Sequence, residues 1–428
     1  MSDRIKRILP RSKRVRVALG ALLVLIIAAA LAGYLYERNR TGSIYHAHAR
    51  FVPEPTPRPL PAPAVDNFTW PLYGYTQDHT RFFPAPAGLH PPFKRLWVNN
   101  AHTLLEFPPV LSGRLLFQLG DDGVLRALDK HSGHTVWTRS LGHLSASSPA
   151  VAGGVVYASV LSRGGGQGEG GRVFALRAAD GATIWSRDLS SPSESSPMLD
   201  KGRLFFGSQS GTVYALNAGN GSVVWTYHAG GAVKASPTLS GGVLYFGDYS
   251  GHVQAVGERS GRPLWVSGSE GALLGSGTFY STPAVYYGRV FLGNTDGRVY
   301  AYDASSGRLD WAVQTGAYVY ASPAVTNAPG LGPTIYLGSY DGAFYALSAR
   351  SGRIDWRFNA HGKISGSATI VGRTVYFADL GTHQTYGLGI STGRPDFELD
   401  TGAFDPVISD GKNIYLTGLE ALYAFTPR

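Results

Sequence analysis

Six aspartates of this 428-residue chain lie in or near glycine-containing turns, where carboxylates could bind a cation or accept a proton. Calcium requires about six to eight oxygen atoms that converge on one point. Asp-Gly between two β segments is instead the strongest short-range signal for a hairpin turn. Turn formation explains these residues without chemistry, so we predict turns and no metal site. The six are Asp121, Asp122, Asp248, Asp296, Asp341 and Asp379.

Other side chains that carry chemistry are scarce or badly spaced. The chain has no Cys, which excludes disulfides, thiolate nucleophiles, cysteine-ligated metals, c-type haem attachment and a lipid-modified N-terminal cysteine. No serine lies in a G-x-S-x-G turn that opens a helix, and the glycine-rich Gly164–Gly171 has no helix after it to bind a phosphate. His131 and His134 stand in a turn, where no helix aligns them as ligands. The sequence therefore predicts no catalytic residue.

These residues belong to a unit that the chain repeats. Ser195–Trp225 reads as short β segments separated by turns at Ser210-Gly211 and Asn220-Gly221. Segments this short are not stable alone. The units recur every 40 to 48 residues and end in a large aromatic side chain, at Trp137, Trp185, Trp225, Trp265, Trp311, Trp356 and Phe397. A large ring at a fixed repeat position indicates packing between units, so we expect these residues and Trp97 to dock one unit against the next.

The last unit ends at Phe425 without its Trp segment, and the missing segment stands at the other end of the array, at Lys94–Trp97. A displaced segment of this kind is how a circular array closes. A period of this length with four short strands is typical of a β-propeller. The predicted fold class is therefore an all-β, eight-bladed β-propeller with an N-terminal closing strand.

The repeats resemble the pyrroloquinoline-quinone (PQQ) repeat family of eight-bladed propellers over about residues 67–428. The resemblance rests on repeats such as SPTLSGGVLYFGDYSGHVQAVGERSGRPLW at 236–265. A second basis is the leader Trp70-Pro71-Leu72-Tyr73-Gly74, followed by Asp78-His79-Thr80-Arg81, which is similar to the family's W-x-x-x-G…R entry segment. The family includes quinoprotein dehydrogenases, outer-membrane assembly scaffolds and sensor domains. It implies that the unit-ending Trp docks between adjacent blades.

The same resemblance implies a cofactor site to be weighed. Dehydrogenases of the family hold PQQ over the central channel with a calcium ion and use an Asp as general base. The blades of this chain are near minimal length, which leaves little room for the long loops that build a dehydrogenase pocket. The absence of a Cys pair also excludes the type with an adjacent-cysteine disulfide. We therefore expect no cofactor, with PQQ and calcium as the alternative.

The N-terminal region predicts membrane attachment. Val17–Tyr36 is an uncharged apolar run long enough to cross a bilayer, behind a basic tail at 1–16 that should stay in the cytoplasm. A cleaved signal peptide is the alternative, and the length of the run favours a signal anchor. Residues 37–66 form a linker in which alternating prolines favour an extended stalk that holds the propeller, at 67–428, off the membrane. The propeller would then be extracytoplasmic, in the periplasm or at the cell surface.

Most of the net charge of +9 lies in residues 1–16 and 37–58, so the propeller itself is nearly neutral. A nucleic-acid partner is not expected, because phosphate backbones are bound by basic surfaces. Because strands alternate in direction, turns between second and third strands share one face with the connections between blades. Loops 163–171, 266–280 and 314–320 fall on that face, and 327–333 falls on the opposite one. Aromatic side chains there are the candidate binding face: Tyr249, Phe279, Tyr280, Tyr318, Tyr320 and Tyr340.

These observations favour a membrane-anchored scaffold for protein–protein interaction or envelope assembly, with an unidentified protein or envelope partner and no enzymatic activity. One alternative is a PQQ- and calcium-dependent dehydrogenase that oxidises an alcohol or sugar. Another is a sensor domain that binds a glycan or small ligand. The outer-membrane assembly scaffold that the chain resembles is a lipoprotein, which a chain without Cys cannot be.

Overall fold

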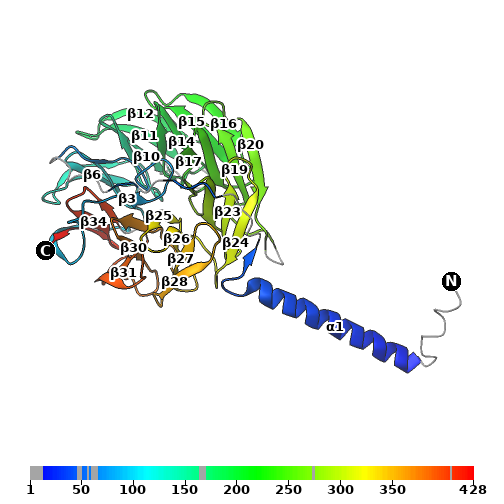
Figure 1. Cartoon of the computed structure of the whole chain (residues 1–428). Coiled ribbons are helices and arrows are strands. Elements are labelled where there is room, and N and C mark those ends of the chain that lie inside the picture. Colours follow the sequence, from blue (N-terminus) through cyan, green and yellow to red (C-terminus); the bar gives the residue numbers. More distant parts are fainter. Residues whose placement is uncertain are drawn as a thin grey trace.

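The computed structural model describes residues 13–45, 51–54, 57–58, 66–162, 170–271, 275–404 and 407–428. Most of the predicted cytoplasmic tail, most of the proline-rich segment and loop 163–169 lie outside these residues. The described part forms eight sheets, each with four main strands, arranged as blades around a centre (Figure 1). The fold class expected from the repeats is confirmed.

The blades are numbered in chain order. Blades 1 to 4 are β5 Val110–Ser112, β6 Leu115–Leu119, β7 Val124–Asp129 and β8 Thr135–Ser140; β9 Ala150–Ala152, β10 Val155–Val160, β11 Arg172–Arg177 and β12 Thr183–Asp188; β13 Met198–Asp200, β14 Arg203–Phe206, β15 Thr212–Asn217 and β16 Val223–His228; β17 Thr238–Ser240, β18 Val243–Gly247, β19 His252–Gly257 and β20 Pro263–Gly268. Blades 5 to 8 are β21 Ala284–Tyr286, β22 Arg289–Gly293, β23 Arg298–Asp303 and β24 Leu309–Gln314; β25 Ala324–Ala328, β26 Gly332–Gly338, β27 Ala343–Ser348 and β28 Ile354–Asn359; β29 Thr369–Val371, β30 Thr374–Ala378, β31 Thr385–Gly389 and β32 Pro395–Leu399; β33 Val407–Ser409, β34 Ile414–Thr417, β35 Ala421–Pro427 and β4 Phe93–Asn100.

The eighth blade takes its outer strand from the start of the propeller. β4 pairs antiparallel with β35, and Trp97 lies opposite Ala424. The first and last strands of the array are therefore hydrogen-bonded to each other, which closes the ring and leaves no terminal blade. The closing strand that the displaced Trp97 predicts is confirmed.

The unit-ending Trp side chains pack against the following blade. Each indole Nε1 donates a hydrogen bond to a backbone carbonyl of that blade, as Trp185 does to Ala218 at 2.9 Å. Six other Trp residues make the equivalent bond at 2.9 to 3.2 Å: Trp97, Trp137, Trp225, Trp265, Trp311 and Trp356. Phe397 has no donor, and its ring instead lies 5.8 Å from that of Phe93 on β4.

A small residue stands opposite every one of these aromatic rings. The strand partner of Trp is Ala in seven blades, and Gly387 lies opposite Phe397 in the other. The register shifts by one residue just after this pair in each blade, which is a β-bulge. The recurring aromatic-Ala-Leu segment of the sequence is thus explained by the space that the indole ring requires.

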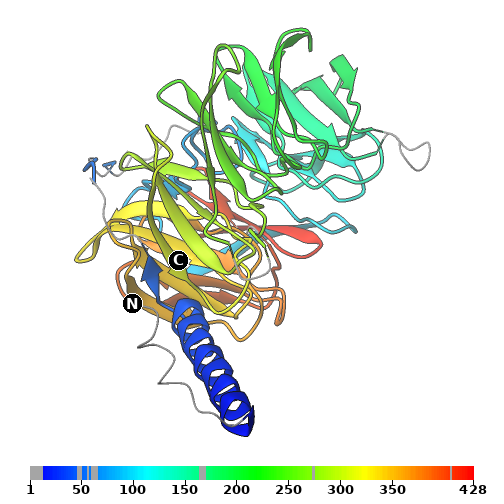
Figure 2. The same cartoon turned by 90° about the vertical axis from the view of Figure 1, so that its right-hand side faces the viewer.

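One helix and three short strands precede the ring. Helix α1 spans Lys13–Asn39, and its Val17–Asn39 part is long and apolar enough to cross a membrane, with a mean hydropathy of 2.5. β1 Ile44–Tyr45 pairs with the outer strand of blade 5, whereas β2 Thr69–Trp70 and β3 Phe82–Phe83 pair with the inner strands of blades 1 and 7. Figure 2 shows α1 projecting from the body beside the strands of blade 5.

The described linker residues 43–45 and 51–54 lie along the propeller, whereas most of the proline-rich segment that is expected to form the stalk lies outside the described residues. Ser43 and Tyr45 follow the outer edge of blade 5, and the ring of Phe51 then stacks on that of Tyr287, with centroids 4.9 Å apart. The Arg350 guanidinium lies 4.0 Å from the Phe51 ring, and Glu54 accepts a hydrogen bond from the Tyr287 N–H at 2.9 Å. These contacts hold residues 43–45 and 51–54 against blade 5.

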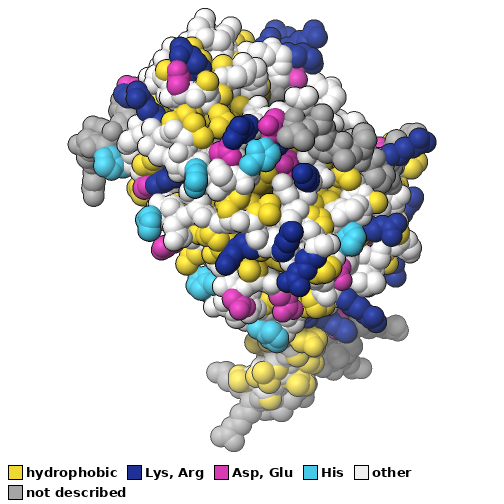
Figure 3. Space-filling model, turned by 90° about the vertical axis from the view of Figure 1, so that its left-hand side faces the viewer, with side chains coloured by type: hydrophobic (Ala, Val, Ile, Leu, Met, Phe, Trp, Pro, Cys, Tyr) yellow, Lys and Arg dark blue, Asp and Glu magenta, His cyan; other side chains and the backbone are white. Residues whose placement is uncertain are grey.

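The surface carries charges of both signs. Figure 3 shows one face of the molecule, on which basic, acidic and histidine side chains alternate with hydrophobic ones. No continuous basic patch covers the face in that view, in agreement with the nearly neutral composition of the propeller.

Candidate functional site

One end of the central channel is closed by the leader segment, residues 69–83. Its carbonyls accept hydrogen bonds from the inner strands, as Pro71 does from Val151 of blade 2 and Asp78 does from Val285 of blade 5. Similar bonds, 2.7 to 2.9 Å long, join Leu239 to Gln77, Val325 to Thr80, Ile370 to Arg81 and Gly372 to Phe83. Gln77 reaches blade 3 through its side chain, and Trp70 packs near Ile408 of blade 8. The leader therefore contacts every blade.

A belt of hydroxyl groups lies next to the leader. It is formed by the Ser or Thr that precedes the repeat proline in blades 2 to 6 and Ala368 in blade 7. The Ser236 N–H donates to Thr282 Oγ1 at 3.1 Å, and the Thr282 N–H donates in turn to Ser322 Oγ at 3.0 Å. The belt continues from Ser322 to Ser367, and Ser148 bonds to Ser196 in the same way. Each hydroxyl thus joins two neighbouring blades at the channel wall.

The opposite end of the channel opens on the face that carries the connections between blades, here called the loop face. The cavity at this mouth has a volume of about 50 Å³. Glu194, Lys234, Tyr280 and Tyr320 line it, and Tyr73 of the leader lies at its floor. Lys234 Nζ and Glu194 Oε1 form an ion pair at 2.7 Å. A space of this size holds a few water molecules.

Five of the six candidate aromatic residues meet in one cluster around this mouth. Ring centroids of neighbours are 4.9 to 6.4 Å apart in the series Tyr249, Tyr280, Tyr320, Tyr340 and Tyr318, hereafter the tyrosine cluster. They come from connections of blades 4, 5 and 6, so distant segments build one surface. Tyr318 is 53% exposed and the other four are partly exposed.

Two lysines flank the cluster. Lys234 Nζ lies 5.1 Å from the centroid of the Tyr249 ring, and Lys363 Nζ lies 5.7 Å from that of Tyr340. Burial raises the pKa of Tyr280 and Tyr320 above the ordinary value, so both phenols stay protonated at neutral pH. The surface therefore offers aromatic area, hydroxyl donors and cations, a combination common at protein interfaces.

Phe279 does not belong to this surface. Its side chain is fully buried, and its ring contacts that of Tyr300 edge-on with centroids 5.6 Å apart. A Cβ on Gly247 would lie 2.3 Å from Phe279 Cβ, so the ring fills a close contact between blades 4 and 5. Phe279 packs in the core, and no partner can reach it on this face.

The turn aspartates accept hydrogen bonds from the backbone of their own turns. In three turns the Asp carboxylate accepts a hydrogen bond from the backbone N–H two residues later. These bonds join Val124 to Asp122 at 3.0 Å, Arg298 to Asp296 at 3.0 Å and Ala343 to Asp341 at 2.9 Å. Asp248 and Asp379 make the same type of bond in their own blades. Among the residues that the structure describes, no three His, Asp or Glu side chains come together as possible metal ligands.

The channel mouth does not fit a quinone cofactor. A pocket for a cofactor of that size has a volume of roughly 300 Å³ or more, against about 50 Å³ at the mouth. Tyr280 and Tyr320 fill the entrance, and the leader with Tyr73 occupies the other end. The arrangement of these residues leaves space for water, not for a tricyclic molecule.

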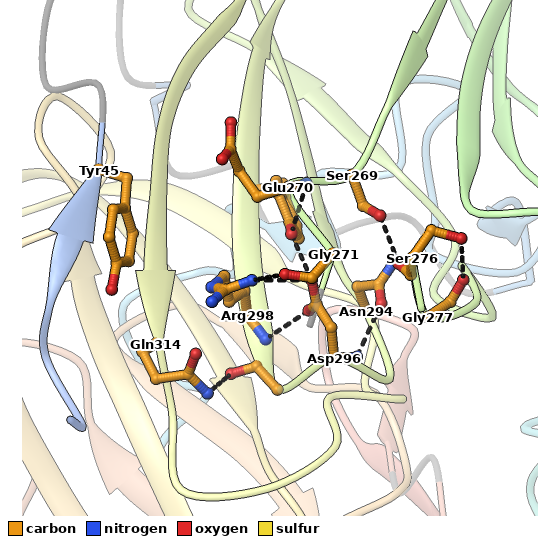
Figure 4. Close-up of polar contacts among 12 residues, drawn as sticks. Tyr45, Ser269, Glu270, Gly271, Ser276, Gly277, Asn294, Asp296, Arg298 and Gln314 are labelled. Carbon is orange, nitrogen blue, oxygen red and sulfur yellow. Dashed lines mark hydrogen bonds and ion pairs between the residues drawn. The ribbon is translucent and has the colours of Figure 1, made fainter. Parts of the chain in front are cut away.

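Helix α1 joins the body at the rim of the loop face. Arg38, in the last turn of α1, donates to the carbonyl of Gly271, which also accepts from the buried Arg298, at 3.1 and 2.6 Å. The Gly42 N–H bonds to the Gln314 carbonyl at 2.8 Å, at the loop-face end of β24. Figure 4 shows the blade 5 side of this junction, in which Tyr45 lies beside Arg298 and the Arg298 guanidinium bonds to Gly271 and Asp296. The helix therefore ends beside the connections that carry Tyr280 and Tyr318.

Closure by β4, the docked Trp residues and the hydroxyl belt together define the class of the protein, an eight-bladed propeller with PQQ-type repeats. The family model described as "Outer membrane protein assembly factor BamB" matches residues 94–168 and 169–317, just over half of the chain. The chain belongs to this BamB-like family of PQQ-repeat propellers. No curated protein sequence matches it.

Solved structures share the fold at low sequence identity. BamB from Moraxella catarrhalis is 16% identical, with a TM-score of 0.64 over 78% of this chain and 100% of that one. Quinohemoprotein alcohol dehydrogenase from Comamonas testosteroni is 14% identical, with a TM-score of 0.68 over 85% and 81% of the two chains. The computationally designed Ika8 protein is also 14% identical, with a TM-score of 0.64 over 78% and 100%. The likeness extends to an enzyme and to a designed protein, so it establishes the fold alone.

Proposed function

We propose that the protein is a membrane-anchored, extracytoplasmic scaffold that binds a protein of the cell envelope through the tyrosine cluster and catalyses no reaction. The observation that carries this proposal is the cluster itself. Five tyrosines in mutual contact lie at a channel mouth that is too small for a cofactor. Partly exposed tyrosine clusters are frequent centres of protein interfaces.

The position of the helix supports a partner at the membrane. β24 runs toward the loop face, and β1 pairs antiparallel with it, so the chain arrives from α1 at the loop-face rim of blade 5. The tyrosine cluster comes from blade 5 and its two neighbours. An anchored α1 would thus hold the cluster close to the membrane surface, within reach of a membrane-embedded partner.

Membership in a family named for an outer membrane assembly factor supports the same reading. The anchor differs, because this chain has no cysteine for lipid attachment and carries an apolar helix instead. A protein of the envelope whose exposed segment lies near the membrane is therefore the partner we propose, with the basic residues before α1 in the cytoplasm.

The test is in-cell photo-crosslinking of the full-length chain. A photoreactive phenylalanine at Tyr318 should give one discrete adduct, because the partner covers the cluster. The same probe at Leu264, which is 58% exposed on the outer strand of blade 4, should give none. Adding Tyr340→Ala to the Tyr318 probe should reduce the adduct about tenfold, as expected for loss of a central aromatic contact. Equal adducts at both positions, or no effect of Tyr340→Ala, would refute the proposed interface.

The enzymatic alternative is tested on the purified full-length protein. PQQ and Ca²⁺ are added, and bound quinone absorbance and dye reduction with alcohols or sugars are followed. We expect neither, because the mouth lacks the volume for the cofactor. Saturable quinone binding with substrate oxidation would replace the scaffold proposal with a dehydrogenase. Glycan binding would appear as a saturable thermal shift with cell-wall fragments.

A further inference from the structure

Lys130, in the turn between β7 and β8 of blade 1, is a buried amine that lies between two carboxylates. Its side chain is 3% exposed, and its Nζ lies 3.3 Å from Asp410 Oδ2 and 3.4 Å from Asp66 Oδ1. Asp410, in the turn between β33 and β34 of blade 8, is also buried, with 5% of its side chain exposed. The three residues therefore meet where the last blade of the ring joins the first.

Contacts with both blades fix the position of Lys130. Its N–H donates to the Arg114 carbonyl at 3.0 Å, and its own carbonyl accepts the Trp97 Nε1–H at 2.9 Å. The Trp97 ring also lies 6.0 Å from that of Tyr415 in blade 8. Reactive groups that a fold orients in this way have effective concentrations of about 10⁵ M or more, which favours condensations that the separate molecules do not undergo.

The Asp410 carboxyl group is held as an acyl-transfer site holds a carbonyl group. Oδ1 accepts the backbone N–H groups of Lys412 and Asn413 at 3.0 and 2.7 Å, and two such donors stabilise negative charge that forms on an oxygen. Oδ2 accepts the Tyr415 hydroxyl at 2.9 Å. Burial raises the pKa of Tyr415, so the hydroxyl keeps its proton and remains a donor to Oδ2.

Other lysine–carboxylate pairs of the described part are more open to solvent. Lys234 Nζ lies 2.7 Å from Glu194 Oε1, but 22% of the lysine side chain and 13% of the glutamate side chain are exposed. Lys201, which pairs with Asp200, is mostly exposed. Solvent has little access to Lys130 and Asp410, and exclusion of water protects a reacting pair from competing hydrolysis.

We propose that Lys130 and Asp410 condense to an isopeptide bond that joins blade 1 covalently to blade 8. Nζ gives one proton to Asp410 Oδ2 and then attacks Cγ, so that negative charge forms on Oδ1. A second proton passes from Nζ through Asp66 to Oδ2, the Cγ–Oδ2 bond breaks, and Oδ2 leaves as water. One ammonium and one carboxylate thus become one amide and one water molecule, and no other reactant is consumed.

The bond is separate from the proposed binding surface. The turns that carry Lys130 and Asp410 join third to fourth and first to second strands, so both lie on the face opposite the loop face. The tyrosine cluster is therefore left free. The bond adds a covalent link between the first and last blades to the hydrogen bonds between β4 and β35.

The test is mass spectrometry of the full-length wild-type protein, denatured after purification. Its intact mass should be one water molecule lower than its sequence requires, and a tryptic digest should contain the Lys130 peptide joined to the Asp410 peptide. Lys130→Arg, which keeps the positive charge, should have its full mass. The Lys234–Glu194 pair is the internal control and should give no joined peptide. Full mass and separate peptides in the wild type would overturn the proposal, as would a bond from Lys130 to Asp66.

A second measurement tests the proton transfer through Asp66. The joined peptide is followed with time after cell-free synthesis of the full-length chain into nanodiscs. Asp66→Asn should slow its formation about a hundredfold, because an amide cannot accept the proton from Nζ. Glu398→Gln, at an exposed carboxylate of β32, should leave the rate unchanged. Equal rates in Asp66→Asn and the wild type would overturn the proposed reaction.

Discussion

Gly221 shows how a single position sets the distance between two blades. It stands in the Asn220-Gly221 turn with a φ of +71°, and a Cβ added there would lie 2.6 Å from the Trp185 ring of the preceding blade. The same contact recurs at Gly133, Gly181, Gly261, Gly307, Gly352 and Gly393. Glycine is thus required twice, for its backbone conformation and for the space that the indole ring occupies.

Gly221→Ala should destabilise the protein by about 3 kcal/mol, because the positive φ and the displaced Trp185 ring both add to the cost. Gly202→Ala is the matched control. Gly202 also has a positive φ, +76°, but no atom lies within 4 Å of the position of its Cβ, so about 1 kcal/mol is expected. Urea unfolding measures the stability of both variants. Equal losses of unfolding free energy would show that the contact with Trp185 does not contribute to stability.

His79 gives the propeller a pH dependence. The unfolded chain takes up a proton at this residue as pH falls below about 6.5, whereas the folded protein does not, because burial lowers the pKa of His79. The stability due to neutral His79 is complete above pH 6.5 and is lost below it by up to about 1.4 kcal/mol per pH unit. His79→Gln should remove this slope between pH 6.5 and 5, as followed by urea unfolding. His361→Gln, at an exposed histidine, should leave it unchanged.

At the scale of elements, β24 differs from the other outer strands. The outer strands β12, β16 and β20 alternate exposed and intermediate residues, whereas β24 is buried from Asp310 to Gln314. The cause is β1, which covers the edge of blade 5 and accepts the Gln314 N–H at the Ser43 carbonyl. A protected edge strand is less prone to pair with other chains.

Ile44→Pro should release this cover, since proline removes a donor and is poorly tolerated in a strand. Hydrogen exchange of the Gln314 amide, whose acceptor is Ser43, should then speed up by at least tenfold. Ile44→Val should leave the rate unchanged. Unaltered exchange in Ile44→Pro would mean that β1 does not protect blade 5 in solution.

The elements that the sequence predicts well are those set by local pattern. Asn220-Gly221 and the equivalent dipeptides of the other repeats predict turns. Trp97, which precedes the first repeat instead of following the last, predicts the closing strand. Both signals lie within short segments of the sequence. Loop positions also place Tyr249, Tyr280, Tyr318, Tyr320 and Tyr340 on one face. Their mutual contact depends on the distances between three blades, which no single segment encodes.

The predictions that fail or fall short depend on tertiary contacts. The proline pattern after Phe51 favours an extended stalk, and most of it lies outside the described residues; the sequence gives no sign that Phe51 itself stacks on Tyr287 and lies against Arg350. Phe279 has the sequence surroundings of a loop residue but fills a contact that Gly247 leaves open. The leader's path across the channel rests on backbone bonds to blades far away in sequence. Within the leader itself, the W-x-x-x-G…R motif is the one feature of the sequence that indicates a special role for this segment.

At the scale of the whole molecule, ring closure rests on the pairing of β4 with β35. This pairing can be tested with an engineered disulfide, because the chain has no cysteine of its own that could compete. Asn100 and Ala421 lie directly opposite each other. The double variant Asn100→Cys/Ala421→Cys should form a disulfide and stabilise the protein by about 5 kcal/mol, since the bond closes a very long loop in the unfolded state.

The measurement is guanidinium unfolding with and without reductant. Asn100→Cys/Tyr423→Cys, two residues out of register, is the control and should not form the bond in the folded protein. A disulfide that forms equally well in both variants would show that the closing strand is not held in one register.

The pairing of β4 with β35 also sets the order of biogenesis. β4 leaves the ribosome early, and its partner follows only after seven complete blades, at residues 421–427. At a synthesis rate of about 5 to 20 residues per second, the leader and β4 wait tens of seconds with an unpaired edge. The ring therefore cannot shut until the final residues arrive. A chain that stops short of β35 keeps an open blade, which makes it a substrate for quality control rather than a shorter propeller.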